Sequence, residues 1–228
     1  MTVEINTIPL GLCRCFALRG DGVVVIDAGQ PGKVRQFASG LRKAGISPEE
    51  VQLIVLTHGH WDHVGSAKDI RSVTGAPIAI HHRDARWLAE GTHPLPRGLT
   101  AWGRIFIAAH RLFSPLIRVP TVEADLKIGD QGMRLDGYGI PGRVIHTPGH
   151  SPGSLSVLLD SGEAFVGDMA MNGLPLRLSP GLSIFAMDEA EMVTSWRLLA
   201  RCGAQTIYPA HGDPFPISRV IDEIENRD

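Results

Sequence analysis

Short apolar runs recur along this chain and are separated by polar turns rich in glycine and proline. Such runs predict buried strands, whereas apolar residues at intervals of three and four predict helices. We expect strands over residues 3–8, 12–18, 22–27, 51–57, 76–81, 126–128, 133–135, 143–146, 155–159 and 163–168, with a last strand from 206 that leads to 211. We expect helices over 33–44, 64–73, 85–89, 188–203 and 217–224. Strands and helices appear twice in the same broad order, which indicates an α/β fold.

The segment 92–125 departs from this order and is interpreted as an insertion. Its apolar residues recur at helical spacing over 99–118, and they are Trp102, Ile105, Phe106, Ala109, Leu112, Phe113 and Leu116. Arginines at 104, 111 and 118 lie on the opposite face, and Pro115 should break the helix near residue 114. The helix could pack on its own domain, cover a site as a lid or contact a second subunit. A membrane-surface role is also conceivable, but three arginines over this length do not favour it.

Composition and charge describe an ordinary soluble globular protein. The 228 residues are 43% hydrophobic and 20% charged, and the net charge is −2. That balance argues against a nucleic-acid partner. No apolar run is long enough to span a membrane, so we expect no membrane partner. No signal peptide is recognisable, and three cysteines suit a reducing compartment, so we expect a cytoplasmic protein in which Cys13 and Cys15 pack in the core.

The stretch 58–63, His-Gly-His-Trp-Asp-His, follows an apolar run at the point where a strand should end and a helix begin. Open α/β sheets place their sites at such ends. Side chains two apart on an extended tip point the same way, so His58 and His60 can share one ion. Asp62 and His63 lie beyond the bend and can face a second ion. Four metal-capable side chains in six residues therefore predict a metal site.

Three later residues complete the candidate set. His150, Asp168 and His211 each follow an apolar run and each lies beside a glycine. Together with the earlier cluster they offer seven nitrogen and oxygen ligands, which suit zinc, iron or manganese and need no thiolate. We expect His81, His82 and His146 to be structural or to lie next to the ligands. We assign no role to His93 and His110.

The ligand pattern resembles the metallo-β-lactamase superfamily: His-x-His-x-Asp-His, then His, Asp and His, in full and in order. The strand and turn at 23–29 with Asp27 is similar to the family's early motif. The resemblance implies a four-layer αββα sandwich, and we expect residues 1–228 to form a single domain. It also implies two divalent ions, with zinc expected first and iron or manganese as alternatives. One ion would be held by His58, His60 and His150, the other by Asp62, His63 and His211, with Asp168 bridging them.

The resemblance further implies a hydrolase in which a hydroxide between the ions attacks the substrate and Asp62 serves as the catalytic residue. The loop 147–153 is similar to the glyoxalase II-like branch, so we expect a small-molecule thioester or lactone as substrate. Met171 stands where lactonase relatives carry a tyrosine, so a lactonase would need another oxyanion donor. The alternatives are a mononuclear iron oxidoreductase of the sulfur dioxygenase type and a metal-binding protein without turnover. A homodimer is one expected assembly.

Overall fold

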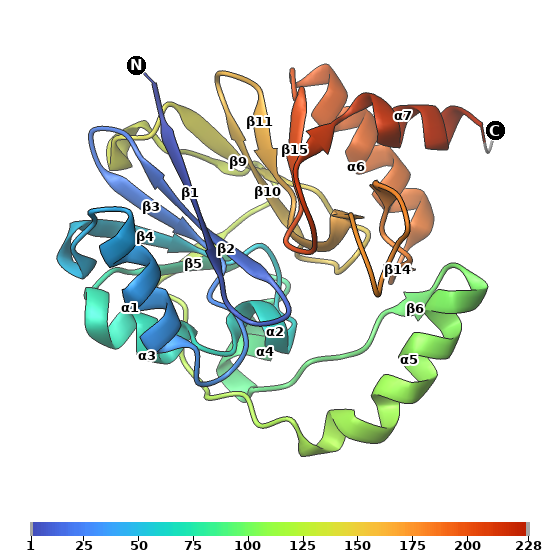
Figure 1. Cartoon of the computed structure of the whole chain (residues 1–228), viewed down its shortest axis with the longest axis horizontal. Helices are drawn as coiled ribbons and strands as arrows, with labels where there is room; N and C mark the ends of the chain where they lie inside the picture. The colour runs from blue at the N-terminus through green and yellow to red at the C-terminus, as the bar shows by residue number, and fades with distance from the viewer. Residues whose placement is uncertain (1, 227–228) are drawn as a thin grey trace.

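Two six-stranded sheets packed face to face form the centre of the computed structural model, which describes residues 2–226 (Figure 1). The first sheet has the order β1 (Glu4–Pro9), β2 (Arg14–Arg19), β3 (Val23–Ile26), β4 (Val51–Val55), β5 (Ile78–His81) and β7 (Leu126–Ile128). Strands β1 to β3 are antiparallel, and β3, β4, β5 and β7 run parallel. The carboxyl ends of these parallel strands therefore share one edge.

The second sheet has the order β16 (Phe215–Pro216), β15 (Thr206–Tyr208), β11 (Glu163–Phe165), β10 (Leu155–Leu159), β9 (Gly142–His146) and β8 (Met133–Arg134). Its neighbours are antiparallel except for β11 and β15, which run parallel. Two shorter pairs, β6 (Arg97–Gly98) with β14 (Phe185–Ala186) and β12 (Ala170–Met171) with β13 (Gly181–Leu182), were not expected from the sequence. Each has only two residues in a strand, too few to show a period.

The alternating direction of side chains along buried strands explains why the two sheets stack. On β2, Cys15 and Ala17 face the outer helices, whereas Phe16 and Leu18 face the second sheet. All four side chains are buried, because successive side chains of a strand point to opposite faces and both faces are covered here. The core role expected for Cys13 and Cys15 is consistent with their burial as free thiols.

Helices cover both outer faces of the sandwich (Figure 1). Helices α1 (Val34–Lys43), α3 (Ala67–Thr74) and α4 (Ala85–Glu90) pack on the first sheet, and α6 (Glu189–Arg201) and α7 (Ser218–Glu225) pack on the second. One apolar cluster lies between each pair of neighbouring layers. The predicted four-layer αββα architecture is therefore confirmed.

Two elements next to the expected ligands differ from the prediction. The helix expected over 64–73 begins only at Ala67, as α3, and is preceded by a separate short helix, α2 (Trp61–Val64). Between the two, the Ser66 side chain donates to the Gln30 carbonyl and accepts from the Lys33 amide. The strand expected over 163–168 ends at Phe165, and a 3₁₀ turn, η4 (Gly167–Met169), carries Asp168. Further 3₁₀ turns are η1 (Pro48–Glu50), η2 (Ser114–Leu116) and η3 (Asp136–Tyr138).

The insertion forms helix α5 (Ala101–Phe113) followed directly by η2, so the expected break near Pro115 is confirmed. Its inner side is narrow: Gly103 and Ile107 are buried, while Trp102, Leu112 and Phe113 are 47%, 75% and 62% exposed. These three side chains of the apolar stripe therefore stay exposed on the surface of the single chain. No helix within residues 2–226 has the length and apolar content needed to cross a membrane.

We expect Phe165→Ala to destabilise the protein by about 3–5 kcal/mol, because this ring fills the space between the two sheets. Its centroid lies 5.0 Å from that of Phe16 and 4.8 Å from that of Tyr208. Phe113→Ala is the matched control, since its exposed ring should contribute no more than about 0.5 kcal/mol. Equal shifts of the urea midpoint for the two variants would contradict this account of the core.

Candidate metal centre

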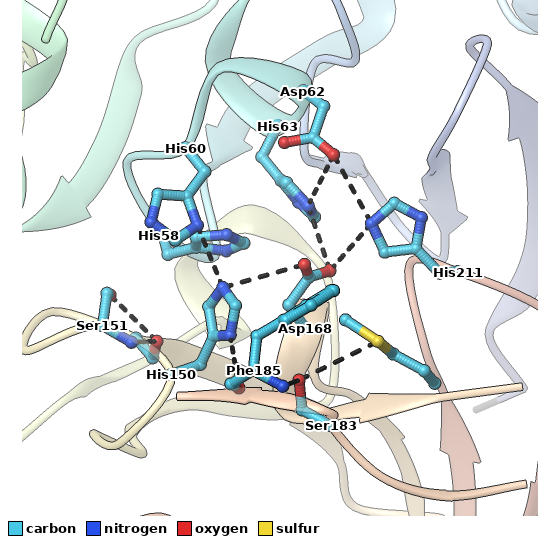
Figure 2. Close-up of polar contacts among 12 residues, drawn as sticks. His58, His60, Asp62, His63, His150, Ser151, Asp168, Ser183, Phe185 and His211 are labelled. Atoms are coloured by element: carbon cyan, nitrogen blue, oxygen red, sulfur yellow. Dashed lines mark hydrogen bonds and ion pairs between the residues drawn. The ribbon is translucent and has the colours of Figure 1, made fainter. Parts of the chain in front are cut away.

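The seven predicted residues converge at one edge of the sandwich, beside the carboxyl ends of the parallel strands (Figure 2). The loop after β4 and the start of α2 supply four of them, and three loops of the second half supply the others. They are His58, His60, Asp62, His63, His150, Asp168 and His211. The structure thus brings together every residue of the predicted set.

Asp27 holds the ligand loop in place through hydrogen bonds. It follows β3 and adopts a left-handed backbone conformation, with φ of 62°. Its buried carboxylate accepts hydrogen bonds from the Thr57 amide at 2.8 Å and the Thr57 hydroxyl at 2.9 Å. It also bonds to Nδ1 of His63 at 2.9 Å. One carboxylate therefore holds the end of β4 and orients an imidazole beyond it.

Each of the five histidines is held through one ring nitrogen and turns the other towards the centre. The partners are the Thr57 hydroxyl for His58 Nδ1, the Pro94 carbonyl for His60 Nε2, Asp27 for His63 Nδ1, the Phe185 carbonyl for His150 Nδ1 and the Leu12 carbonyl for His211 Nδ1. Metal-binding histidines are oriented in this way in proteins. A carbonyl oxygen can only accept, so the bonded nitrogens of His60, His150 and His211 carry the proton. The nitrogens that His60 and His150 turn to the centre carry a lone pair, because burial lowers the pKa of both imidazoles.

The lone pairs of His60 and His150 face each other. His60 Nδ1 and His150 Nε2 lie 2.9 Å apart in a buried position. The buried atom His58 Nε2 also lacks a hydrogen bond within residues 2–226. Opposed lone pairs at this distance repel unless a cation lies beside them. The donor set therefore fits divalent ions.

The ligand atoms fall into two groups joined by one carboxylate. His58, His60 and His150 form the first group, and Asp62, His63 and His211 form the second; the ligand atoms of each lie within 4.8 Å of one another.

Asp168 lies between the groups. Its Oδ1 is 3.1 Å from Nε2 of both His63 and His211, and its Oδ2 is 3.7 Å from Nε2 of His150. One oxygen therefore faces each group, the arrangement required of a bridging ligand.

The first group is neutral in the absence of metal. Burial lowers the pKa of His58 well below its usual value, and burial together with His150 lowers the pKa of His60 to about 3. Burial also lowers the pKa of His150. These imidazoles therefore present lone pairs at neutral pH without first losing a proton.

The second group is charged in the absence of metal. Burial alone would lower the pKa of His211, but the Asp168 carboxylate outweighs it and raises that pKa to about 10. The same carboxylate, with Asp27, raises the pKa of His63 against the effect of burial. Burial would raise the pKa of Asp62, yet His63 and His211 lower it to about 2. Two imidazoliums therefore face two carboxylates in this group.

Asp84 is a residue of the site that the sequence did not reveal. Its buried carboxylate accepts from the Gly59 amide at 3.0 Å, the Gly153 amide at 2.9 Å and the Ser151 hydroxyl at 2.6 Å. It thus ties the loop of His58 and His60 to the loop of His150. An aspartate between a strand and a short helix carries no motif that would have marked this role.

A cleft of about 450 Å³ is lined by five of the seven residues, namely His60, Asp62, His150, Asp168 and His211. Most of its wall is apolar and includes Trp61, Leu95, Phe106 and Ile107. The insertion also brings His93 and His110 to this wall, although the sequence assigned them no role. His110 stacks on Trp61 with ring centroids 5.9 Å apart. No sequence signal placed them there, because nothing in a helical period reveals which site a helix covers.

His81 and His146 remain outside the site, in line with the structural role expected for them. Their rings stack with centroids 4.0 Å apart, and both approach Asp130.

The sequence profile of the metallo-beta-lactamase superfamily matches residues 8–211. The probable metallo-hydrolase YqgX of Bacillus subtilis is 27% identical over 168 residues, which cover 72% of this chain and 69% of that protein. The hydroxyacylglutathione hydrolase GloC of Haemophilus influenzae is 24% identical over 181 residues, covering 76% of this chain and 74% of that protein. In a relative from Mycobacterium tuberculosis the matched part spans 63% of the relative's length.

Solved structures show the same architecture. The BLEG-1 B3 metallo-beta-lactamase aligns with a TM-score of 0.70 at 21% identity, covering 96% of this chain and 97% of that one. TTHA1623 in a di-iron-bound form aligns with a TM-score of 0.63 at 21% identity, covering 92% of each chain. Such identities show the fold alone. With the profile match over 8–211, they establish that this chain belongs to the metallo-beta-lactamase superfamily.

Proposed function

We propose that this protein is a hydrolase that uses two divalent ions, zinc first, to cleave a small thioester or lactone. The observation that carries the proposal is the pair of ligand groups that share Asp168, each with lone pairs or carboxylates turned to a common point. A mononuclear iron enzyme would not need the second group. The relatives named as a probable metallo-hydrolase and a hydroxyacylglutathione hydrolase support hydrolysis as the reaction class.

The ions, when bound, supply hydroxide near neutral pH and polarise the substrate carbonyl. The chain itself positions the reactants. Oδ2 of Asp62 lies 3.5 Å from Nε2 of His211 and 4.0 Å from Nε2 of His63, so this oxygen belongs to the second ligand group. The other oxygen of Asp62 is then available to accept a hydrogen bond from the attacking water. We therefore assign the catalytic role to Asp62.

The cleft supports a small substrate with an apolar acyl group. Its volume of about 450 Å³ lies in the range of small-molecule sites. The apolar side chains Leu95, Phe106 and Ile107 can exclude water around an acyl chain. A mostly apolar cleft does not suit a nucleic acid, for which a basic surface is expected.

Metal analysis and a substrate panel test this proposal together. Protein purified without added metal should contain about two ions per chain and should hydrolyse a member of a panel of thioesters, lactones and β-lactams. Asp62→Asn should lower kcat by about 10–100-fold or more at full metal occupancy. Asp21→Asn, on the exposed turn between β2 and β3, is the control and should retain full activity.

Three outcomes would contradict it. One iron per chain with oxygen-dependent turnover would favour the sulfur dioxygenase alternative. Two ions without turnover on any substrate of the panel would favour a metal-binding protein. Full activity of metal-loaded Asp62→Asn would remove the role assigned to that carboxylate.

We expect the two ions to differ in the protons that they displace. The first group holds neutral imidazoles, so its ion should bind with little proton release at pH 7. The raised pKa values of His63 and His211 mean that the second ion must displace protons, and its affinity should fall as pH falls from 8 to 6. Calorimetric titration of apoprotein in buffers of different ionisation enthalpy measures this. Identical proton release in both binding steps would contradict the assignment.

Asp84→Asn should weaken metal binding by about 10–100-fold, because an amide cannot accept all three hydrogen bonds that join the ligand loops. Asp125→Asn is the matched control: its carboxylate also accepts from a main-chain amide, that of Ile78, and pairs with Arg71, but far from the ligands. Both variants should lose stability, and only Asp84→Asn should lose metal affinity in competition with a chelator. Equal affinities would make Asp84 a purely structural residue.

A further inference from the structure

Exposed large apolar side chains gather around the mouth of the cleft. Nine are exposed within residues 2–226, and eight of these belong to three segments that border the cleft. They are Leu12 in the β1–β2 turn, Trp102, Ile105, Leu112, Phe113 and Leu116 on α5 and η2, and Leu174 and Leu178 in the loop between β12 and β13. The ninth is Val73 on α3.

The exposed residues of the insertion form one stripe. Trp102, Ile105, Ala109, Leu112 and Leu116 follow one another at intervals of three and four. Residues at these intervals share a face of a helix. An ordinary surface helix buries such a face, but here the buried residues Gly103 and Ile107 lie on the other side. The apolar face of α5 is thus directed away from the protein.

The same segment is strongly basic. Residues 91–122 contain Arg97, Arg104, Arg111 and Arg118, spaced seven apart, and no aspartate or glutamate. All four arginines are exposed, in a chain whose net charge is −2. Arginines on one face and an exposed apolar stripe with a tryptophan on the other make up the composition of helices that lie in the interface of an anionic membrane.

We propose that this surface, the exposed faces of α5 and η2 with the two neighbouring loops, binds an anionic phospholipid bilayer and directs the mouth of the cleft towards it. A second copy of the chain fits less well. Residues 91–122 carry four exposed arginines and no acid, so a second copy of this segment brings no negative charge to pair with them. A bilayer also accepts side chains that protrude from three separate segments, because it requires no complementary shape.

The exposed apolar surface is continuous with the substrate cleft. Leu12 and Leu174 are exposed and also line the cleft, so the apolar surface continues into the substrate site. A substrate with an apolar acyl group can then pass from the lipid phase to the cleft. The sequence-based expectation of no membrane partner depended on the lack of an apolar run long enough to span a bilayer, and a surface-bound helix needs no such run.

Co-sedimentation of the metal-loaded protein with vesicles tests the proposal. The protein should bind vesicles of phosphatidylcholine mixed with phosphatidylglycerol, bind pure phosphatidylcholine weakly, and dissociate as salt is raised. Leu112→Asp should lower the partition coefficient about tenfold or more. Val73→Asp is the matched control, since it changes an exposed apolar residue outside the surface and should bind as the wild type does.

A double variant separates the charge contribution. Arg104→Ala with Arg111→Ala should lower binding to the anionic vesicles about thirtyfold. Metal content and circular dichroism identify any variant that fails to fold. The proposal is overturned if anionic vesicles do not sediment the wild type, or if Leu112→Asp and Val73→Asp bind equally. It is also overturned if sedimentation velocity shows a dimer that Leu112→Asp dissociates while vesicle binding is absent, because the surface then joins two copies.

Discussion

Five buried imidazoles must turn a free nitrogen to one point, and most of the architecture can be understood from that constraint. Each ring needs a partner for its other nitrogen, and the partners come from separate parts of the chain. Thr57 and Asp27 lie at the ends of neighbouring strands of the first sheet. The carbonyls of Leu12, Pro94 and Phe185 come from a turn, the insertion and β14. Both sheets and the insertion are therefore tied to the same small volume.

That dependence couples the metal ions to the fold. The opposed lone pairs of His60 and His150 are unfavourable when the site holds only protein atoms, and they become favourable when a cation lies beside them. The unfolded chain cannot hold all seven ligands together, so ion binding stabilises the native state. Asp84 contributes to the same end without touching the centre, since its three hydrogen bonds fix the spacing of two ligand loops.

The sequence revealed the ligands better than it revealed what holds them. The cluster at 58–63 is contiguous, and His150 and His211 each follow a recognisable strand, so spacing alone marked them. Among the groups that orient the rings, the sequence marked Asp27 through its motif. The carbonyls of Pro94 and Phe185 could not be recognised, because they are main-chain atoms that any residue would supply. The layers were predictable because the pattern of apolar side chains along a buried strand is a local property of the sequence. The pairing of β6 with β14 was not predictable, because it joins residues far apart in the sequence.

The insertion shows where periodicity stops being informative. The spacing of its apolar residues predicted a helix, and Pro115 predicted where that helix ends. Such spacing shows that one face of a helix is apolar, but it does not show what covers that face. The inner side of α5 approaches the body through Gly103, where a Cβ would collide with the Ile184 carbonyl oxygen. This close backbone approach, with the short β6–β14 pair beside it, holds the helix over the cleft with little apolar burial. The large side chains are consequently left on the outer face, where their burial depends on something other than this chain.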